Sequence, residues 1–261
     1  MSRRISTIIL DWAGTTVDYG CFAPVNAFIS AFNDFGIRAG IEETRAPMGM
    51  AKRAHIEKML ESPGIAGQWR AKYGRSHTDN DVADIYERFE PALFKVLTQH
   101  ASPIPGAVDA VAKIRSMGIG IGSTTGYTKA MMDVVAPAAK KNGYAPDCLV
   151  CPEDAGGKGR PYPFMLWRNL EILGVMSVRS VLKVGDTVAD MEEGKNAGCL
   201  TVGVLKGSSL QGLSEDETAG MSGTELSQLM EMTRSRYMDA GADCVIGEIS
   251  ALPALIESMN S

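Results

Sequence analysis

The sequence contains no segment typical of a membrane-spanning or exported protein. None of the apolar runs in its 261 residues approaches the length of about 20 residues that crosses a bilayer. The apolar run near the N-terminus is interrupted by Asp11, too early for the apolar region of a signal peptide. We therefore expect a cytoplasmic protein. The sequence also lacks internal repeats and low-complexity tracts.

Positive charge is scarce. The net charge is −5 at pH 7, and no long basic block is present. Nothing in the charge pattern therefore favours a nucleic acid or an anionic membrane surface as a partner. We expect a small-molecule partner, and an anionic substrate would require basic residues that gather locally.

The cysteine content does not indicate a disulfide framework. Five cysteines are an odd number in a chain of this length, which favours reduced thiols. Cys148 and Cys151 have the spacing of a redox or zinc motif. Residues 147–151 nevertheless have the pattern of a strand, so the two side chains would lie on opposite faces, and no second pair of ligands follows.

Short apolar runs alternate with helical stripes over most of the chain. The composition, with 45% apolar and 22% charged residues, suffices for one large domain or two unequal ones. The apolar runs predict strands at residues 8–10, 119–123, 147–151, 181–184, 200–204 and 244–246. Helices are predicted at residues 108–117, 128–141, 163–173, 191–197 and 226–240. Repeated strand and helix units indicate an α/β fold with a doubly wound parallel sheet.

The region between the first two predicted strands has a different pattern, with helices and turns only. Residues 24–35 carry an apolar helical stripe, a second stripe begins near Ile56, and a long amphipathic helix is predicted over residues 82–97. Proline and glycine at residues 102–106 mark the return to the alternating pattern. We therefore expect a small helical insert after the first strand.

The first predicted strand ends in a carboxylate. Open parallel sheets bind ligands at the carboxyl ends of their strands, and Asp11 lies at such an end. Gly14 lets the backbone pass close to a ligand, and the hydroxyls and amides of Thr15 and Thr16 can donate to phosphoryl oxygens. The alternative is that Asp11 only caps a turn after the strand.

Two other predicted strands also end in polar groups. The hydroxyl cluster of residues 123–125 follows one strand, and Asp186 follows another, with Asp190 one helical turn later. The sheet would bring these groups to Asp11. Carboxylates from separate strand ends suit Mg²⁺, which prefers oxygen ligands. Asp190 would orient the metal or its waters, or it would simply be an acidic residue favoured near a helix N-terminus.

Three segments resemble the motifs of the haloacid dehalogenase superfamily in order, spacing and context. They are Asp-Trp-Ala-Gly-Thr-Thr from Asp11, Gly-Ser-Thr-Thr-Gly from Gly122, and Gly-Asp-Thr-Val-Ala-Asp from Gly185. That superfamily places a helical cap domain where this chain has its helical insert. The resemblance implies a core domain of residues 1–20 and 101–261 and a cap domain of residues 21–100.

A narrower resemblance covers nearly the whole chain. Residues 11–24, the Pro-Met-Gly at 47–49 with Lys52 and His55, and Gly-Arg-Pro-Tyr-Pro at 159–163 are similar to the phosphonatase family of that superfamily. This resemblance implies hydrolysis of the carbon–phosphorus bond of phosphonoacetaldehyde, in a phosphonate degradation pathway. It also implies a homodimer that associates through the cap helices.

The resemblance implies specific roles for residues of the core domain. Asp11 would be the nucleophile, and Mg²⁺ would be held by Asp11, the Ala13 carbonyl and Asp186. The residues that would contact the phosphoryl group or its surroundings are Thr15, Ser123, Thr125, Gly126 and Arg160. Thr125 would bind phosphoryl oxygens, although Ser123 stays open for that role. Arg160 would supply the positive charge for which many relatives use lysine.

The resemblance places a second set of residues on the cap side. Lys52 would condense with the aldehyde as an imine, with Cys21, Met48 and His55 lining the site around it. The alternatives for two of these are ordinary structural roles. Met48 would then belong to a helix core, and His55 would be a solvated helix residue.

Lys52 must be neutral to attack an aldehyde, whereas an exposed lysine has a pKa of about 10.4. We expect burial beside Met48 and Met50, with Arg53 nearby, to lower this pKa by desolvation and by repulsion between like charges. His55 lies three residues beyond Lys52, on the same helical face, and could shuttle protons.

The main departure from the superfamily pattern is Ala13. Phosphatases of this superfamily usually carry a second aspartate two residues after the nucleophile, where it protonates a leaving alkoxide. Its absence argues against a phosphate-ester phosphatase or phosphomutase, the nearest alternative function. A catalytically silent binding protein is the other alternative, and the joint presence of Asp11, Lys52, Arg160 and Asp186 argues against it.

Overall fold

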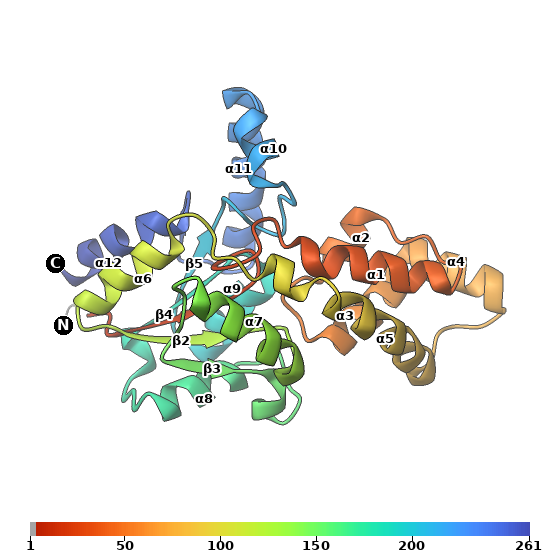
Figure 1. Cartoon of the computed structure of the whole chain (residues 1–261), viewed down its shortest axis with the longest axis horizontal. Coiled ribbons are helices and arrows are strands. Elements are labelled where there is room, and N and C mark those ends of the chain that lie inside the picture. Colours follow the sequence, from red (N-terminus) through yellow and green to blue (C-terminus); the bar gives the residue numbers. More distant parts are fainter. Residues whose placement is uncertain (1–3) are drawn as a thin grey trace.

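The computed structural model describes residues 4–261, which contain one parallel sheet of six strands (Figure 1). The strands are β1 (Thr7–Leu10), β2 (Gly120–Thr124), β3 (Cys148–Val150), β4 (Val181–Gly185), β5 (Leu200–Val204) and β6 (Cys244–Ile246). Their spatial order is β3-β2-β1-β4-β5-β6. The six predicted strands and the doubly wound α/β class are confirmed.

Both faces of the sheet are covered, as the unbroken apolar sequence of β1 requires. Ile8 and Ile9 are neighbours in β1 and point to opposite faces. Ile9 packs in a cluster with Leu166 and Leu170 of α8 (Phe164–Ile172), whereas Ile8 belongs to the main core, which includes Ile114 of α6 (Ala107–Ser116). Burial of these apolar side chains on both faces is the main force that holds the layers together.

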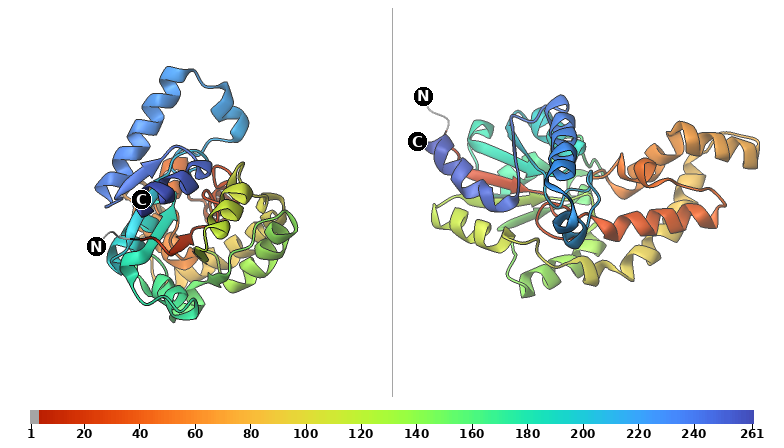
Figure 2. Two further views of the ribbon diagram at one scale, coloured as in Figure 1. Left: turned by 90° about the vertical axis from the view of Figure 1, so that its left-hand side faces the viewer. Right: turned by 90° about the horizontal axis from the view of Figure 1, so that it is seen from above.

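The helices outside the insert flank the sheet (Figure 1). They are α6 (Ala107–Ser116), α7 (Lys129–Lys141), α8 (Phe164–Ile172), α9 (Val188–Ala197), α10 (Glu215–Gly220), α11 (Gly223–Asp239) and α12 (Leu252–Asn260). The predicted helices are confirmed with shifts of a few residues at their ends, and α12 was not predicted. Figure 2 shows α10 and the start of α11 projecting away from the sheet.

The insert contains helices only, as expected. They are α1 (Phe22–Asp34), α2 (Ile41–Arg45), α3 (Lys52–Glu61), α4 (Pro63–Tyr73) and α5 (Asp79–Phe94), and we refer to them as the cap helices. They lie to one side of the sheet (Figures 1 and 2). Phe28 of α1 stacks on Phe89 of α5 with ring centroids 4.1 Å apart. Domain boundaries at residues 20 and 100 stay a prediction.

None of the helices in residues 4–261 has the length and apolar character needed to cross a bilayer.

Two adjacent chain segments connect the cap helices to the sheet. Val17 and Pro103 form an antiparallel bridge, and the Asp18 N–H donates to the Ser102 carbonyl at 3.3 Å. The buried Asp18 carboxylate accepts the N–H groups of the first turn of α1 and contacts Nδ1 of His100 at 2.9 Å. The Asp18–His100 pair therefore ties the outgoing segment to the returning one.

We expect this pair to make stability depend on pH. Its hydrogen bond to Asp18 raises the pKa of His100 above the ordinary value. Protonated His100 therefore stabilises the folded chain fully below about pH 6.5, and this contribution is lost as the pH rises through the raised pKa. His100→Gln should lower the unfolding temperature at pH 6 and have less effect at pH 9.

Thermal unfolding of the two proteins across this pH range is the measurement. His77→Gln removes a histidine outside the ion pair and serves as the control. A difference between wild type and His100→Gln that stays constant from pH 6 to pH 9 would contradict this role of the pair.

Candidate active site

Asp11 directly follows β1 and is 4% exposed. The parallel register pairs Leu10 with both Ser123 and Val184, so three strands end at the same level. Gly14 in the next turn has φ +89°, and a Cβ atom there would overlap the Asp186 carboxylate. A residue without a side chain is therefore needed for the β1 loop to pass this close to Asp186.

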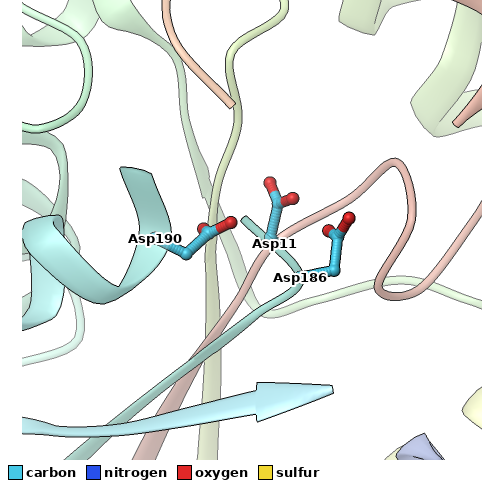
Figure 3. A group of neighbouring side chains, drawn as sticks. All are labelled: Asp11, Asp186 and Asp190. Atoms are coloured by element: carbon cyan, nitrogen blue, oxygen red, sulfur yellow. The ribbon is translucent and has the colours of Figure 1, made fainter. Parts of the chain in front are cut away.

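Three buried carboxylates converge at these strand ends (Figure 3). One carboxylate oxygen from each of Asp11, Asp186 and Asp190 lies within 4.8 Å of the others. Burial, together with the negative charges of Asp11 and Asp190, raises the pKa of Asp186 well above its ordinary value. A cation among these oxygens would favour the ionised form of Asp186, and all-oxygen donors suit a hard divalent cation.

Asp186 is oriented by two donors. Thr15 Oγ1 donates to one carboxylate oxygen at 2.7 Å, and the Ser209 N–H donates to the other at 2.8 Å. Thr15 was predicted to contact a phosphoryl group, but the structure places its hydroxyl on Asp186 and not on the wall of the cavity described below. Thr15 therefore orients a candidate metal ligand.

Asp190 is held by cations and by its own helix turn. Its Oδ1 lies 2.8 Å from Lys183 Nζ and 3.1 Å from Arg160 Nη1, and its Oδ2 accepts the Thr187 hydroxyl at 2.5 Å. Burial acts to raise the pKa of Asp190, but the positive charges of Arg160 and Lys183 keep this pKa below its ordinary value. The Asp190 carboxylate is therefore ionised and fixed in orientation.

Arg160 joins the carboxylates to each other. Its Nη2 donates to Asp11 Oδ1 at 2.6 Å and its Nε donates to Glu193 at 3.1 Å. Its side chain is fully buried, and Lys183 Nζ also contacts Glu193 at 3.1 Å. Our sequence reasoning missed Lys183 and Glu193. A lysine inside the apolar run of β4, and a glutamate three residues after Asp190, were the available signals.

A cavity of about 20 Å³ lies between these groups and the cap helices, close to what one water molecule requires. Its lining comes from both sides and comprises Asp11, Ala13, Cys21, Met48, Gly49, Lys52, Thr125, Gly126, Tyr127, Arg160 and Thr187. The structure thus brings together Asp11, Lys52 and Arg160. Any substrate larger than water requires the cap helices to move before it enters.

Lys52 begins α3, is 5% exposed, and lies with its Nζ 4.6 Å from the centre of the Tyr127 ring. Burial lowers its pKa to about 8, with a further contribution from the positive charge of Arg160. Our expectation that Arg53 supplies the like charge is wrong. Arg53 is exposed and donates to the Asp79 carbonyl at 3.3 Å.

His55 is neither solvated nor part of the cavity lining. It is fully buried, its Nε2 lies 2.8 Å from the Thr44 carbonyl oxygen, and its ring stacks on Phe28 at 3.9 Å. Burial and the charge of Lys52 lower the pKa of His55 well below its ordinary value. Met48 lies in a turn, lines the cavity and packs with Cys21 and Val25 in an apolar cluster, so it is a buried apolar residue but not part of a helix.

The structure distinguishes the two candidate hydroxyls of the β2 motif. Ser123 Oγ donates to the Cys148 carbonyl at 3.1 Å and does not line the cavity, whereas Thr125 and Gly126 do. A Cβ atom on Gly126 would meet the Gly49 carbonyl oxygen at 2.9 Å, so the cap side approaches closely here. Cys148 and Cys151 are free thiols in separate apolar clusters, as their strand pattern predicted.

The fold and the cluster of carboxylates agree with a family match. The sequence profile of haloacid dehalogenase-like hydrolases matches residues 5–198, which cover β1, the cap helices and all three carboxylates. The chain is a haloacid dehalogenase-like hydrolase. A putative β-phosphoglucomutase from Bacteroides vulgatus is only 16% identical, and its TM-score of 0.70 shows the shared fold alone.

Proteins with higher sequence identity identify the family within these hydrolases. The phosphonoacetaldehyde hydrolase of Bacillus cytotoxicus is 48% identical over 97% of this chain and 96% of its own length. That of Bacillus cereus is 46% identical over the same shares. A phosphonoacetaldehyde hydrolase-like protein from Oleispira antarctica is 36% identical, with a TM-score of 0.94 over 98% of this chain and 92% of its own. The chain belongs to the phosphonoacetaldehyde hydrolase family.

We predict that close contact across the cavity depends on Gly49. This residue has φ +85°, and a Cβ atom would overlap the Thr187 hydroxyl of the core. Gly74 has a similar φ of +69° with nothing within 4 Å of its Cβ position. Both Ala variants should lose about 1–2 kcal/mol through backbone strain. Gly49→Ala should lose about 1–3 kcal/mol more, or expose residues 47–52.

Urea unfolding and hydrogen exchange of residues 47–52 measure these effects. Equal losses in the Gly49 and Gly74 variants, with unchanged exchange in residues 47–52, would show that the cap helices do not need this close contact.

Proposed function

We propose that this protein hydrolyses the carbon–phosphorus bond of phosphonoacetaldehyde to acetaldehyde and phosphate. The observation that carries the proposal is the buried Lys52, whose pKa is about 8, in the same cavity as Asp11. About one-tenth of such a lysine is neutral at pH 7, hundreds of times more than for an exposed lysine. The similar proteins of Bacillus cytotoxicus and Bacillus cereus are phosphonoacetaldehyde hydrolases, which supports the same reaction here.

Ala13 favours a carbon leaving group. It lines the cavity two residues after Asp11, at the position where a general acid for an ester oxygen would stand. A departing carbon needs an electron acceptor instead of a proton on oxygen. An imine between Lys52 and the substrate aldehyde supplies that acceptor.

The reaction would begin with the imine and end with hydrolysis of an aspartyl phosphate. Neutral Lys52 adds to the aldehyde carbon, and with the uptake of one proton from water one water molecule leaves, which gives a positively charged iminium nitrogen. The later hydrolysis of the aspartyl phosphate returns that proton. An oxygen of Asp11 bonds to phosphorus as the carbon–phosphorus bond breaks. The electron pair of the broken bond passes to the iminium nitrogen, which leaves an enamine. Protonation at carbon and addition of water release acetaldehyde and restore Lys52. A second water hydrolyses the aspartyl phosphate and restores Asp11.

The chain's own residues favour a metal at this site. Asp11, the Ala13 carbonyl and Asp186 would hold Mg²⁺, which would offset the repulsion between a carboxylate and an anionic phosphonate. The oxygen-only donor set and the raised pKa of Asp186 fit such an ion. Asp190 would keep Arg160 in place and help to orient the metal's surroundings.

The remaining lining residues have positions that suit substrate binding. Arg160 and Thr125, with Gly126, would contact the phosphoryl oxygens, while Cys21 and Met48 line the wall near Lys52. Ser123 and Thr15 would act indirectly, because their hydroxyls are engaged elsewhere. His55 would shuttle protons only if the cap helices move, since it does not line the cavity. The homodimer through the cap helices stays a prediction.

Product analysis tests the reaction. With Mg²⁺, the protein should release phosphate and acetaldehyde from phosphonoacetaldehyde in equal amounts, and chelation of the metal should suppress both. Asp11→Asn, checked for deamidation, removes the nucleophile and should abolish turnover. A kcat/KM for simple phosphate monoesters equal to or above that for phosphonoacetaldehyde would favour a phosphatase or phosphomutase and overturn the proposal.

Chemical trapping tests the imine. Borohydride added with substrate should reduce the imine to a secondary amine and inactivate the protein, with the added mass on Lys52. The trapping rate should rise with pH as Lys52 loses its proton around pH 8. Lys52→Arg should lose at least about a hundredfold in kcat/KM.

Lys58→Arg is the matched control for the trapping experiment. Lys58 lies on the same helix, is exposed and pairs with Glu61 at 2.8 Å, so this variant should keep full activity. An adduct on another lysine, or full activity of the Lys52→Arg variant, would exclude the imine mechanism and leave the fold assignment intact.

A further inference from the structure

Arg45 is a buried cation without an acidic partner in the described part of the chain. It ends α2 in the cap and is 7% exposed. Its Nη1 donates to the Gly20 carbonyl and to the Ser209 carbonyl, each at 2.8 Å. Within residues 4–261 no carboxylate forms a salt bridge with it, and its buried Nε has no hydrogen-bond partner. Burial of an unpaired cation is costly, and hydrogen bonds from its N–H groups offset only part of that cost.

The residue that Arg45 contacts in the core also holds Asp186. The Ser209 N–H donates to Asp186 Oδ2 at 2.8 Å, while the Ser209 carbonyl accepts from Arg45. The neighbouring Ser208 hydroxyl donates to the Asp186 main-chain carbonyl at 3.1 Å. A single residue of the 207–213 loop therefore connects a cap side chain to a carboxylate of the active site.

The other contact of Arg45 is with the segment that leads into the cap. The Gly20 carbonyl accepts from Arg45, and the Gly20 N–H donates to the Gly207 carbonyl at 2.8 Å. Gly212, with φ +63°, lies so close that a Cβ atom would meet the guanidinium carbon of Arg45 at 2.6 Å. Arg45 thus contacts the connecting segment at Gly20 and the 207–213 loop at Ser209 and Gly212.

We propose that Arg45 is a positioning residue which orders the 207–213 loop, and through Ser209 the Asp186 carboxylate, only when the cap helices are closed. The proposal rests on the function proposed above. When the cap helices move away to admit substrate, Arg45 leaves the Ser209 carbonyl and becomes hydrated, and the Ser209 N–H loses its support. Closure re-forms both contacts, so the metal ligand is best oriented when Lys52 faces Asp11.

Arg45 binds the 207–213 loop through a main-chain carbonyl and not through a carboxylate, so the contact is strong enough to form but weak enough to break. Hydrogen bonds from a charged donor to neutral carbonyls offset only part of the desolvation of the guanidinium. These hydrogen bonds therefore stabilise the closed arrangement without preventing it from opening. A salt bridge at the same place would resist the opening that each turnover requires.

Arg45→Met tests the proposal against Arg53→Met. Both variants remove one positive charge from the cap, but Arg53 is exposed and donates to the Asp79 carbonyl within the cap. Without any substrate, we expect Arg45→Met to speed hydrogen exchange in residues 207–213 and to weaken Mg²⁺ binding about tenfold by calorimetry. Arg53→Met should change neither. These readouts do not involve turnover, so they stay separate from the test of the reaction itself.

Gly212→Ala provides a second variant, which approaches Arg45 from the core. Its Cβ atom should displace the guanidinium and reproduce faster loop exchange and weaker Mg²⁺ binding, and Gly74→Ala controls for the backbone strain. Gly212→Ala decides the question if Arg45→Met does not fold. Unchanged loop exchange and Mg²⁺ affinity in a folded Arg45→Met or Gly212→Ala variant, or equal changes in the matched control, would overturn the proposal.

Discussion

Burial of like charges at the end of the sheet is the constraint on which the rest of this structure depends. Asp11, Asp186, Asp190 and Glu193 are all less than 5% exposed. Within residues 4–261, only two buried cations, Arg160 and Lys183, form salt bridges with this group. If all four acids are ionised, two negative charges have no protein partner. Burial, together with the negative charges of Asp11 and Asp190, raises the pKa of Asp186, and a divalent cation would offset this repulsion.

The position of these acids could be predicted from the sequence because strand ends in a parallel sheet share one edge. Asp11 and Asp186 each follow an apolar run, and the register of β1 with β4 then brings them together. Lys183 and Glu193 could not be predicted in the same way. A lysine in a strand is usually exposed, and only the packing of α9 over β4 shows that this one is enclosed.

The direction in which each side chain points could not be predicted from the sequence either. Thr15 and Ser123 lie in the expected motifs. Their hydroxyls donate to Asp186 and to the Cys148 carbonyl, respectively, and do not line the cavity. Helix α4 begins with proline and glycine and buries only Ile65 and Trp69, which is too weak a stripe to predict. Tertiary contacts decide such cases, and local patterns do not contain them.

Contact between the cap and the core sets the electrostatic environment of both Lys52 and Asp11. Lys52 is positioned by the cap and Asp11 by the sheet, so neither has its functional environment alone. Closure removes water, which lowers the pKa of Lys52 and strengthens every interaction among the buried charges. A cavity of about 20 Å³ leaves no room for substrate in this state. Binding would have to compensate for separating the cap from the core, and under the proposed function a ligand with both an aldehyde and a phosphonate would contact both sides.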